Sequence, residues 1–268
     1  MRSVRELFDL HDRVALVTGA AGHIGLACCD ALAELGAKIV VADLSADACA
    51  TRAAHLRDRW KVDATPIAAD LGDPDLACRE LVDKAVAAHG RLDILVNNAA
   101  YTGTSTMPGW ATDFDHQTLD AWNAAMTVNL AAPFRLAQCA RPYLAASRAG
   151  TIVNVSSIYG LVGPQPAMYE GTTMANPTAY GASKGGLIQL SRYLATLLAP
   201  SIRVNCLVPG GVARNQPDVF RARYDERTPL GRMASEEDFK GAFAFLASDA
   251  SAYVTGQTLA VDGGWTTW

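Results

Sequence analysis

A tyrosine and a lysine four positions apart are the first residues of this chain that could perform chemistry together. They are Tyr180 and Lys184, in the stretch TAYGASKGGL that follows Pro177. On a helix, residues i and i+4 share one face, so the lysine ammonium would lie beside the phenol and favour its ionised form. A phenolate held in this way can remove the proton of an alcohol, and the phenol can return it. Taken alone, the pair is also compatible with an ordinary surface contact between helical turns.

The elements that must position this pair follow an alternating pattern. Short β-branched runs such as VALVTG, AKIVVAD and GTIVNVSS alternate with runs rich in alanine and leucine, which predict helices near 23–35, 46–60, 74–89, 116–146, 179–199 and 235–247. Continuous apolar strands are typical of a parallel sheet that helices cover on both faces. We therefore predict an α/β fold with seven parallel strands, in one domain that spans residues 1–268. Ligands of such sheets bind at the carboxyl ends of the strands.

A glycine-rich turn follows the first predicted strand. It reads TGAAGHIG over residues 18–25 and leads directly into a helix. Glycines at such a turn let the backbone approach a pyrophosphate, whose charge is met by free N–H groups and by the positive end of the helix dipole. The context of the turn therefore indicates a dinucleotide site.

Asp43 ends the second predicted strand, 24 residues after Gly19. A carboxylate at this point can accept hydrogen bonds from the adenosine ribose hydroxyls, and it would repel a 2′-phosphate. This spacing favours NAD over NADP, although an exposed turn or cap aspartate is the simpler alternative. Asp70 and Leu71 end the third strand, and the run NNAA ends the fourth, so four successive strand ends could outline one ligand.

With these motifs in view, the chain resembles the short-chain dehydrogenase/reductase family from about Val14 to Asp262. The matching stretches are TGAAGHIG, NNAA, VNL, VSS, YGASK, VNCLVPGG and VDGG. The resemblance implies a Rossmann-type doubly wound sheet, a nicotinamide cofactor and a homo-oligomer, either a tetramer or a dimer. It implies a secondary alcohol and a ketone as the reacting pair.

The resemblance also implies roles for individual residues. The catalytic residues would be Asn129, Ser157, Tyr180 and Lys184. Of these, Ser157 would hydrogen-bond the substrate oxygen, and Asn129 would hold a water that links the lysine to solvent. Together with Tyr180 and Lys184, the cofactor would contact Gly19, Ala21, Gly22, His23, Ile24, Gly25, Asp43, Leu44, Asp70, Leu71, Asn97, Ala99, Pro209, Gly210 and Val212. The chain departs from the usual family pattern at His23, Ala100 and Arg214.

The segment between Ser157 and Tyr180 is about ten residues longer than is usual in the family. The insert, residues 158–176, carries tyrosines, an acid, amides and threonines, so it could be a mobile lid that recognises a polar substrate, or a plain loop insertion. With the closing VDGGWTTW, it is similar to oxidoreductases of bacterial surface-sugar and flagellin modification. The alternatives are a 3-oxoacyl-carrier-protein reductase, which Asp43 disfavours, and a non-catalytic dinucleotide sensor.

Composition narrows the possible partners. The 268 residues carry a formal net charge of −4, with scattered basic residues, which argues against nucleic acid as a partner. No apolar run reaches the length of a membrane span, and no apolar leader precedes the first strand, so we expect a cytoplasmic protein that is not bound to a membrane. The six cysteines form no CxxC pair, and no ligand spacing predicts a metal. A small-molecule substrate remains the expected partner.

Overall fold

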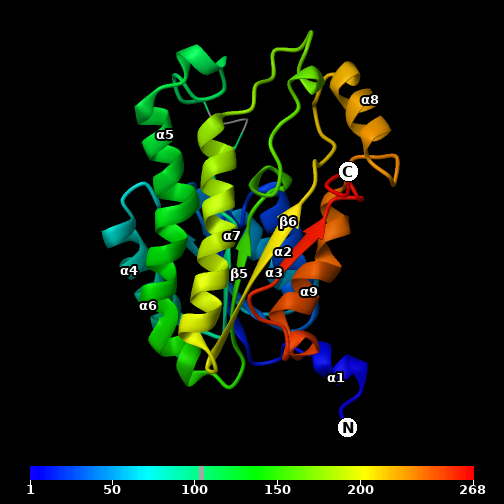
Figure 1. Ribbon diagram of the computed structural model, residues 1–268. Helices are drawn as coiled ribbons and strands as arrows, with labels where there is room; N and C mark the ends of the chain where they lie inside the picture. The colour runs from blue at the N-terminus through cyan, green and yellow to red at the C-terminus, as the bar shows by residue number, and fades with distance from the viewer. Residues whose placement is uncertain (103–105) are drawn as a thin grey trace.

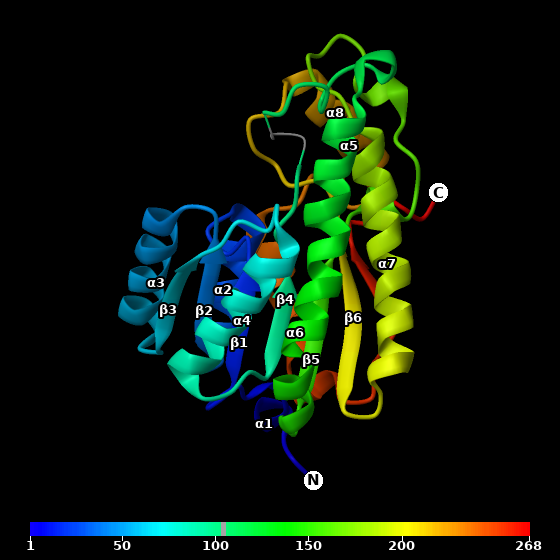
Figure 2. The same cartoon turned by 90° about the vertical axis from the view of Figure 1, so that its left-hand side faces the viewer.

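The computed structural model describes residues 1–102 and 106–268. One sheet of seven parallel strands runs through it in the order β3-β2-β1-β4-β5-β6-β7. Figure 2 shows this order across the sheet, with the connecting loops and α8 above the carboxyl ends of the strands. The strands are Val14–Thr18 (β1), Lys38–Asp43 (β2), Ala64–Ala68 (β3), Ile94–Asn97 (β4), Gly150–Val155 (β5), Ile202–Pro209 (β6) and Thr258–Val261 (β7). The predicted α/β Rossmann-type fold is confirmed.

Two apolar cores hold the helices on the two faces of the sheet. The helices are Val4–Phe8 (α1), His23–Glu34 (α2), Ala46–Trp60 (α3), Pro74–His89 (α4), Leu119–Met126 (α5), Ala132–Ala146 (α6), Thr178–Leu198 (α7), Asp218–Arg227 (α8) and Lys240–Ala247 (α9). Alternate residues of each strand face opposite sides. One core joins the sheet to α2, α3 and α9, and the other joins it to α4, α6 and α7. None of these helices of the described chain is long and apolar enough to cross a membrane.

The helix predicted near 116–146 is interrupted. It begins only at Leu119, where the Thr118 hydroxyl accepts the Ala121 N–H, and a π-helical turn, Thr127–Ala131, separates α5 from α6. A π-turn inserts an extra residue and rotates the helix, and such turns are frequent at functional sites. Because apolar spacing continues through the turn, the sequence pattern did not reveal it.

The chain after β6 also holds a helix that the sequence pattern did not predict. α8 is mostly polar and buries only Phe220 and Tyr224. These rings join Trp265 in a third apolar cluster above the sheet, and α8 lies beside the C-terminus (Figure 1). The cluster depends on contacts between distant residues, so local periodicity gave no signal for it.

Candidate active site

The order of the strands reverses between β1 and β4, and a cavity of about 470 Å³ opens there, at the carboxyl ends of the strands. A reversal of this kind leaves a crevice because the neighbouring connections run to opposite faces of the sheet. The cavity extends from Asp43 and Asp70 at one end to Tyr180 and Lys184 at the other. The motifs read from strand ends therefore meet at one place.

The glycine turn forms one wall of this cavity. Gly19 has a φ of +62°, and a Cβ there would lie 2.9 Å from the Cα of Ala99. A Cβ at Gly25 would lie 2.0 Å from the carbonyl oxygen of Gly19, so this position excludes any side chain. Gly22 is the N-cap of α2 and offers no side-chain cap, which leaves the first N–H groups of the helix for a ligand. These features fit the pyrophosphate of a dinucleotide.

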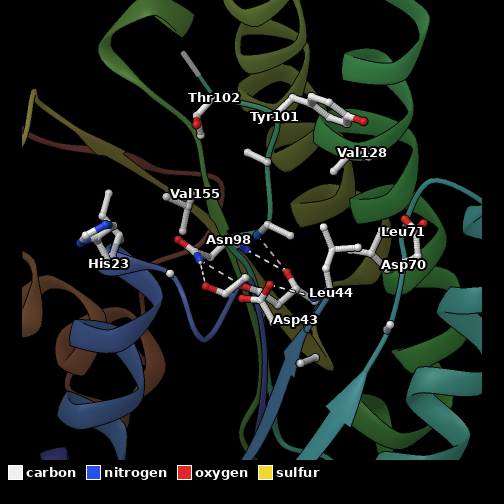
Figure 3. A pocket seen from close by; sticks show the side chains of 18 of the residues that line it. His23, Asp43, Leu44, Asp70, Leu71, Asn98, Tyr101, Thr102, Val128 and Val155 are labelled. Atoms are coloured by element: carbon white, nitrogen blue, oxygen red, sulfur yellow. Dashed lines mark hydrogen bonds between the residues drawn. The ribbon is translucent and has the colours of Figure 1, made fainter. Parts of the chain in front are cut away.

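Asp43 is held in position by two backbone groups. Its carboxylate accepts the N–H of Ala21 at 2.9 Å and the N–H of Leu44 at 2.8 Å. The first bond ties the end of β2 to the glycine turn, and the side chain lines the cavity (Figure 3). A fixed carboxylate beside the turn fits the ribose of an adenosine.

The two asparagines at the end of the fourth strand make different contacts. Asn97 is buried and donates to Asn154 Oδ1 at 2.7 Å, so its side chain lies beside that of its register partner on β5. The next residue, Asn98, lines the cavity and donates to the carbonyls of Thr18 and Gly19 at 3.0 and 2.9 Å, as Figure 3 shows. Asn98 therefore braces the glycine turn, a task that the strand-end pattern did not assign to it.

The remaining cofactor candidates divide into two groups. Those that line the large cavity with the residues above are Gly22, His23, Ile24, Leu44, Leu71 and Ala99. At the end of β6, Pro209 pairs with Val261 of β7, Gly210 lines a smaller neighbouring cavity, and Val212 forms a bridge with Ala234. The second group lies at the end of β6 and in the loop that follows it, outside the lining of the large cavity.

Tyr180 and Lys184 lie on the first turns of α7, as their spacing predicts. Lys184 is buried and donates from Nζ to the carbonyl of Val155 at 2.7 Å, and Nζ lies 5.8 Å from the centre of the Tyr180 ring. Burial lowers the pKa of Lys184 to about 8. Burial also raises the pKa of Tyr180, and a hydrogen bond with Ser157 opposes that rise. At neutral pH the chain by itself thus presents a protonated phenol beside a charged ammonium.

Ser157 and Asn129 both lie close to this pair. Ser157 Oγ accepts the N–H of Tyr159 at 3.2 Å, which occupies a lone pair and leaves the hydroxyl proton to donate. Asn129 is buried in the π-helical turn, where it accepts the Tyr101 N–H at 2.7 Å and donates to Ser183 Oγ at 3.0 Å. These hydrogen bonds of Asn129 therefore reach Tyr101, which packs in one apolar cluster with Tyr180, and Ser183, which precedes Lys184.

A charged contact that the sequence pattern did not indicate lies at the mouth of the cavity. Glu236 Oε1 lies 3.3 Å from Arg214 Nε and 3.3 Å from His23 Nδ1. Arg214 and His23 both line the cavity; His23 begins α2, and Arg214 lies in the loop after β6. The described residues include no cluster of His, Cys, Asp or Glu side chains that could hold a metal.

Comparison with known proteins identifies the class to which this fold and site belong. The family model described as Enoyl-(Acyl carrier protein) reductase matches residues 19–266. The chain belongs to the short-chain dehydrogenase/reductase family, whose oxidoreductases act on CH–OH groups and bind a nicotinamide dinucleotide.

Three similar proteins illustrate the range of the family. The 3-oxoacyl-(acyl-carrier-protein) reductase FabG of Thermotoga maritima is 36% identical, and the match covers 95% of this chain and 98% of that protein. The cis-4-hydroxycyclohexanecarboxylate dehydrogenase of Sinomonas cyclohexanicum is 38% identical, with coverage of 95% and 97%. The crystal structure of a gluconate 5-dehydrogenase from Burkholderia cenocepacia, in complex with NADP and tartrate, superposes with a TM-score of 0.87 at 32% identity, covering 99% of this chain and 100% of that one.

Proposed function

We propose that this protein is an NAD(H)-dependent oxidoreductase that interconverts a secondary alcohol and a ketone, with Tyr180 as the acid and base. The observation that carries the proposal is the single cavity that joins the glycine turn and Asp43 to Tyr180 and Lys184. One end of this cavity fits an adenosine ribose, and the other end holds a phenol beside a buried cation. The intact set of polar groups at the second end argues against a non-catalytic dinucleotide sensor.

Each side chain has a distinct part in the reaction. The bound nicotinamide supplies the hydride acceptor or donor. Tyr180 removes the proton of the alcohol during oxidation and returns it during reduction, and Ser157 donates to the substrate oxygen as charge develops there. Lys184 stabilises the phenolate and donates to the ribose hydroxyls. Asn129 holds the α5–α6 junction in place beside these groups and, with a bound water, connects Lys184 to solvent.

The protonation state of Tyr180 decides whether it can act as the acid in ketone reduction or as the base in alcohol oxidation. Because burial raises the pKa of Tyr180, the chain by itself holds the protonated form that ketone reduction requires. Alcohol oxidation requires the phenolate, which the ammonium of Lys184 and the positive charge of an oxidised nicotinamide both favour. The ionisation of Tyr180 that oxidation requires therefore depends on the charge of the bound cofactor.

The preference for NAD rests on Asp43. Replacing Asp43 with alanine should narrow the ratio of kcat/KM for NADH over NADPH by about tenfold or more, because the change removes a ribose acceptor and a repulsive charge. Steady-state kinetics with both cofactors measures this ratio. Asp47→Ala is the control, since Asp47 is an exposed aspartate at the start of α3. A wild-type enzyme that prefers NADPH contradicts the assignment.

Arg214 has two candidate partners, a cofactor phosphate or an anionic group of the substrate. Arg214 contacts Glu236, and Glu236 also contacts His23 at the start of α2. Arg214 therefore lies near the helix N-terminus where a pyrophosphate would bind, which favours the cofactor phosphate as its partner. Arg214→Ala should then raise the Kd of NADH, measured by fluorescence titration, by roughly tenfold. Arg221→Ala, an exposed arginine on α8, is the control. An unchanged Kd with a raised substrate KM assigns Arg214 to the substrate instead.

The substrate that we propose is polar and sugar-like. The insert, residues 158–176, brings hydroxyl and amide groups above the carboxyl end of β5, and a gluconate dehydrogenase is among the similar structures. The FabG relative supports a 3-oxoacyl-carrier-protein reductase as the second candidate. Turnover of polyhydroxylated alcohols with NAD, set against reduction of acetoacetyl thioesters with either cofactor, tests the proposal and separates the two.

The outer face of α6 and α7 supports a homo-oligomer. Phe134 of α6 and Tyr193 and Leu197 of α7 are exposed by 44%, 64% and 60%. The two helices lie side by side in both views (Figures 1 and 2). Exposed apolar groups on adjacent helices are typical of a surface that a second subunit covers. We place the dimer or tetramer in the cytoplasm, as expected for an enzyme that depends on the cytoplasmic pool of NAD.

A further inference from the structure

A single carboxylate joins two segments that line the cavity beside the glycine turn. Glu236 Oε1 lies 3.3 Å from Arg214 Nε and 3.3 Å from His23 Nδ1. His23 begins α2 next to the glycine turn (Figure 3), and Arg214 lies in the loop after β6. Both line the cavity, and Glu236 contacts them from outside its lining. Glu236 can therefore act on a ligand through the positions of Arg214 and His23.

The backbone that leads to Glu236 is bonded to the loop that carries Arg214. The N–H of Ala213 donates to the carbonyl of Ala234 at 2.8 Å, and the N–H of Ala234 donates to the carbonyl of Gly211 at 2.9 Å. These two bonds hold the segments side by side. The main chains on either side of the ion pair are therefore fixed relative to each other, and the contact between Arg214 and Glu236 joins neighbouring segments.

Glu236 begins the short 3-10 helix Glu236–Phe239 (η5), which is anchored at both ends. At its start, the carboxylate of Asp238 accepts the N–H and the hydroxyl of Ser235, at 2.7 and 3.1 Å. At its end, Phe239 is fully buried in the apolar core that joins the sheet to α2. Because the cap and the core hold this helix, the carboxylate of Glu236 extends from a fixed backbone beside α2.

The contact with Glu236 leaves most of the donors of Arg214 available. A guanidinium carries five N–H donors, one on Nε and four on the two Nη atoms. The carboxylate of Glu236 accepts from Nε, and no hydrogen bond within the described chain engages either Nη atom. A guanidinium that is held at Nε and lines the cavity can present its Nη groups to a phosphate.

Holding this side chain before a ligand arrives lowers the cost of binding. An arginine that is free to rotate loses rotamer freedom when it clamps a phosphate, and that loss weakens the affinity. Arg214 is about one-third exposed, so its guanidinium has room to move when no partner restrains it. The negative charge of Glu236 opposes an anionic ligand. The hydrogen bond that Glu236 accepts, and not its charge, is therefore what would favour the ligand.

We propose that Glu236 is a positioning residue of the cofactor site, which holds Arg214 for the pyrophosphate of the dinucleotide. The inference rests on the proposed NAD(H)-dependent function and deepens it, because it assigns a part in cofactor binding to a residue outside the lining of the cavity. The second contact of Glu236, with His23, keeps the carboxylate between the start of α2 and the loop after β6.

The test measures the binding of ADP-ribose, which has the pyrophosphate but no nicotinamide, by titration calorimetry. Glu236→Ala should raise the Kd of ADP-ribose and of NADH by about three- to tenfold. Glu236→Gln keeps an oxygen that can accept from Arg214, so its Kd should stay within about twofold of the wild-type value. Glu237→Ala, at the exposed neighbouring position, is the control. Thermal unfolding monitors whether each variant is folded.

A double-mutant cycle determines whether Glu236 acts through Arg214. In an Arg214→Ala background, Glu236→Ala should change the Kd of ADP-ribose by less than about twofold. The Kd of adenosine, which has no phosphate, should be the same in every variant. A loss that persists without Arg214, or that extends to adenosine, assigns Glu236 a general structural role and overturns the inference. A lower Kd in Glu236→Ala identifies Glu236 as a competitor for Arg214 and also overturns it.

Failure of the proposed function gives a different result. ADP-ribose binding that follows the expected pattern, without turnover of any alcohol or ketone, supports the inference and contradicts the oxidoreductase function. Turnover with NAD by an enzyme that binds ADP-ribose equally well with and without Glu236 supports the function and overturns the inference.

Discussion

Replacing Tyr180 with phenylalanine should reduce kcat by roughly 10²–10⁴-fold while leaving the Kd of NADH nearly unchanged. The ring is retained, so packing beside Trp110 and Ala179 in the local apolar cluster persists. The lost hydroxyl is the only part that can exchange a proton with the substrate oxygen, and general acid–base catalysis is typically worth a factor of this size. Single-turnover kinetics and fluorescence titration with NADH measure the two quantities.

Tyr253→Phe is the matched control for this change, because Tyr253 is fully exposed. It should behave as the wild type does. A Tyr180→Phe enzyme that retained a large part of kcat with the same substrate would show that another group transfers the proton. Ser157 is the nearest alternative donor, since its hydrogen bond already acts on the pKa of Tyr180.

Replacing Lys184 with methionine should lower kcat/KM by roughly 10²-fold or more, because the phenolate loses its neighbouring cation. Unlike the tyrosine change, it should also weaken NADH binding by about tenfold, since in the proposed function the ammonium donates to the ribose. Lys84→Met is the control, on the exposed face of α4, where Lys84 pairs with Glu80. An unchanged NADH affinity in Lys184→Met would contradict the ribose contact.

The same variant has a pH-dependent effect on stability. The pKa of Lys184 is about 8 in the folded chain and near 10.5 when the lysine is unperturbed. Below pH 8 the lysine is charged in both states, so the folded state bears the full penalty for a buried charge. Between pH 8 and 10.5 the unfolded state binds more protons, and raising the pH stabilises the wild type. Relative to Lys184→Met, the free energy of unfolding should increase by roughly 3 kcal/mol over this window, measured by urea denaturation.

The spacing of residues along the chain predicted the helix that carries Tyr180 and Lys184 and the strand that Asp43 ends. Both depend on local rules. Apolar periodicity defines each element, and an i,i+4 pair shares a helix face wherever that helix lies. The glycine turn was also predicted from the sequence, because Gly19 and Gly25 occupy positions where the backbone approaches other backbone too closely for a side chain. The seven parallel strands followed from the alternation of strands and helices and from the family resemblance, and the structure confirms them.

The contacts of Asn97 and Asn98 could not be predicted from local spacing. Adjacent residues of a strand face opposite sides, so a shift of one position decided that Asn98 braces the glycine turn while Asn97 bonds to Asn154 within the sheet. The cofactor contact assigned to Asn97 stays a prediction, as do the other site roles. The mobility proposed for the insert also stays a prediction, and its contacts with α8 restrict where movement could occur.

The sequence by itself determined the class of fold, the family with its nicotinamide dinucleotide and the helix face that Tyr180 and Lys184 share, because those features are encoded by neighbours within a turn or a strand. Only the tertiary structure decided which distant groups meet. Glu236 reaches Arg214 and His23 from a third segment, and Tyr169 meets Phe220 across about fifty residues of chain. Such contacts arise when helices and loops pack to bury apolar surface, and the packing fixes positions that no local spacing records. The contacts of the insert with α8 therefore belong to the part of the structure that the sequence pattern described least.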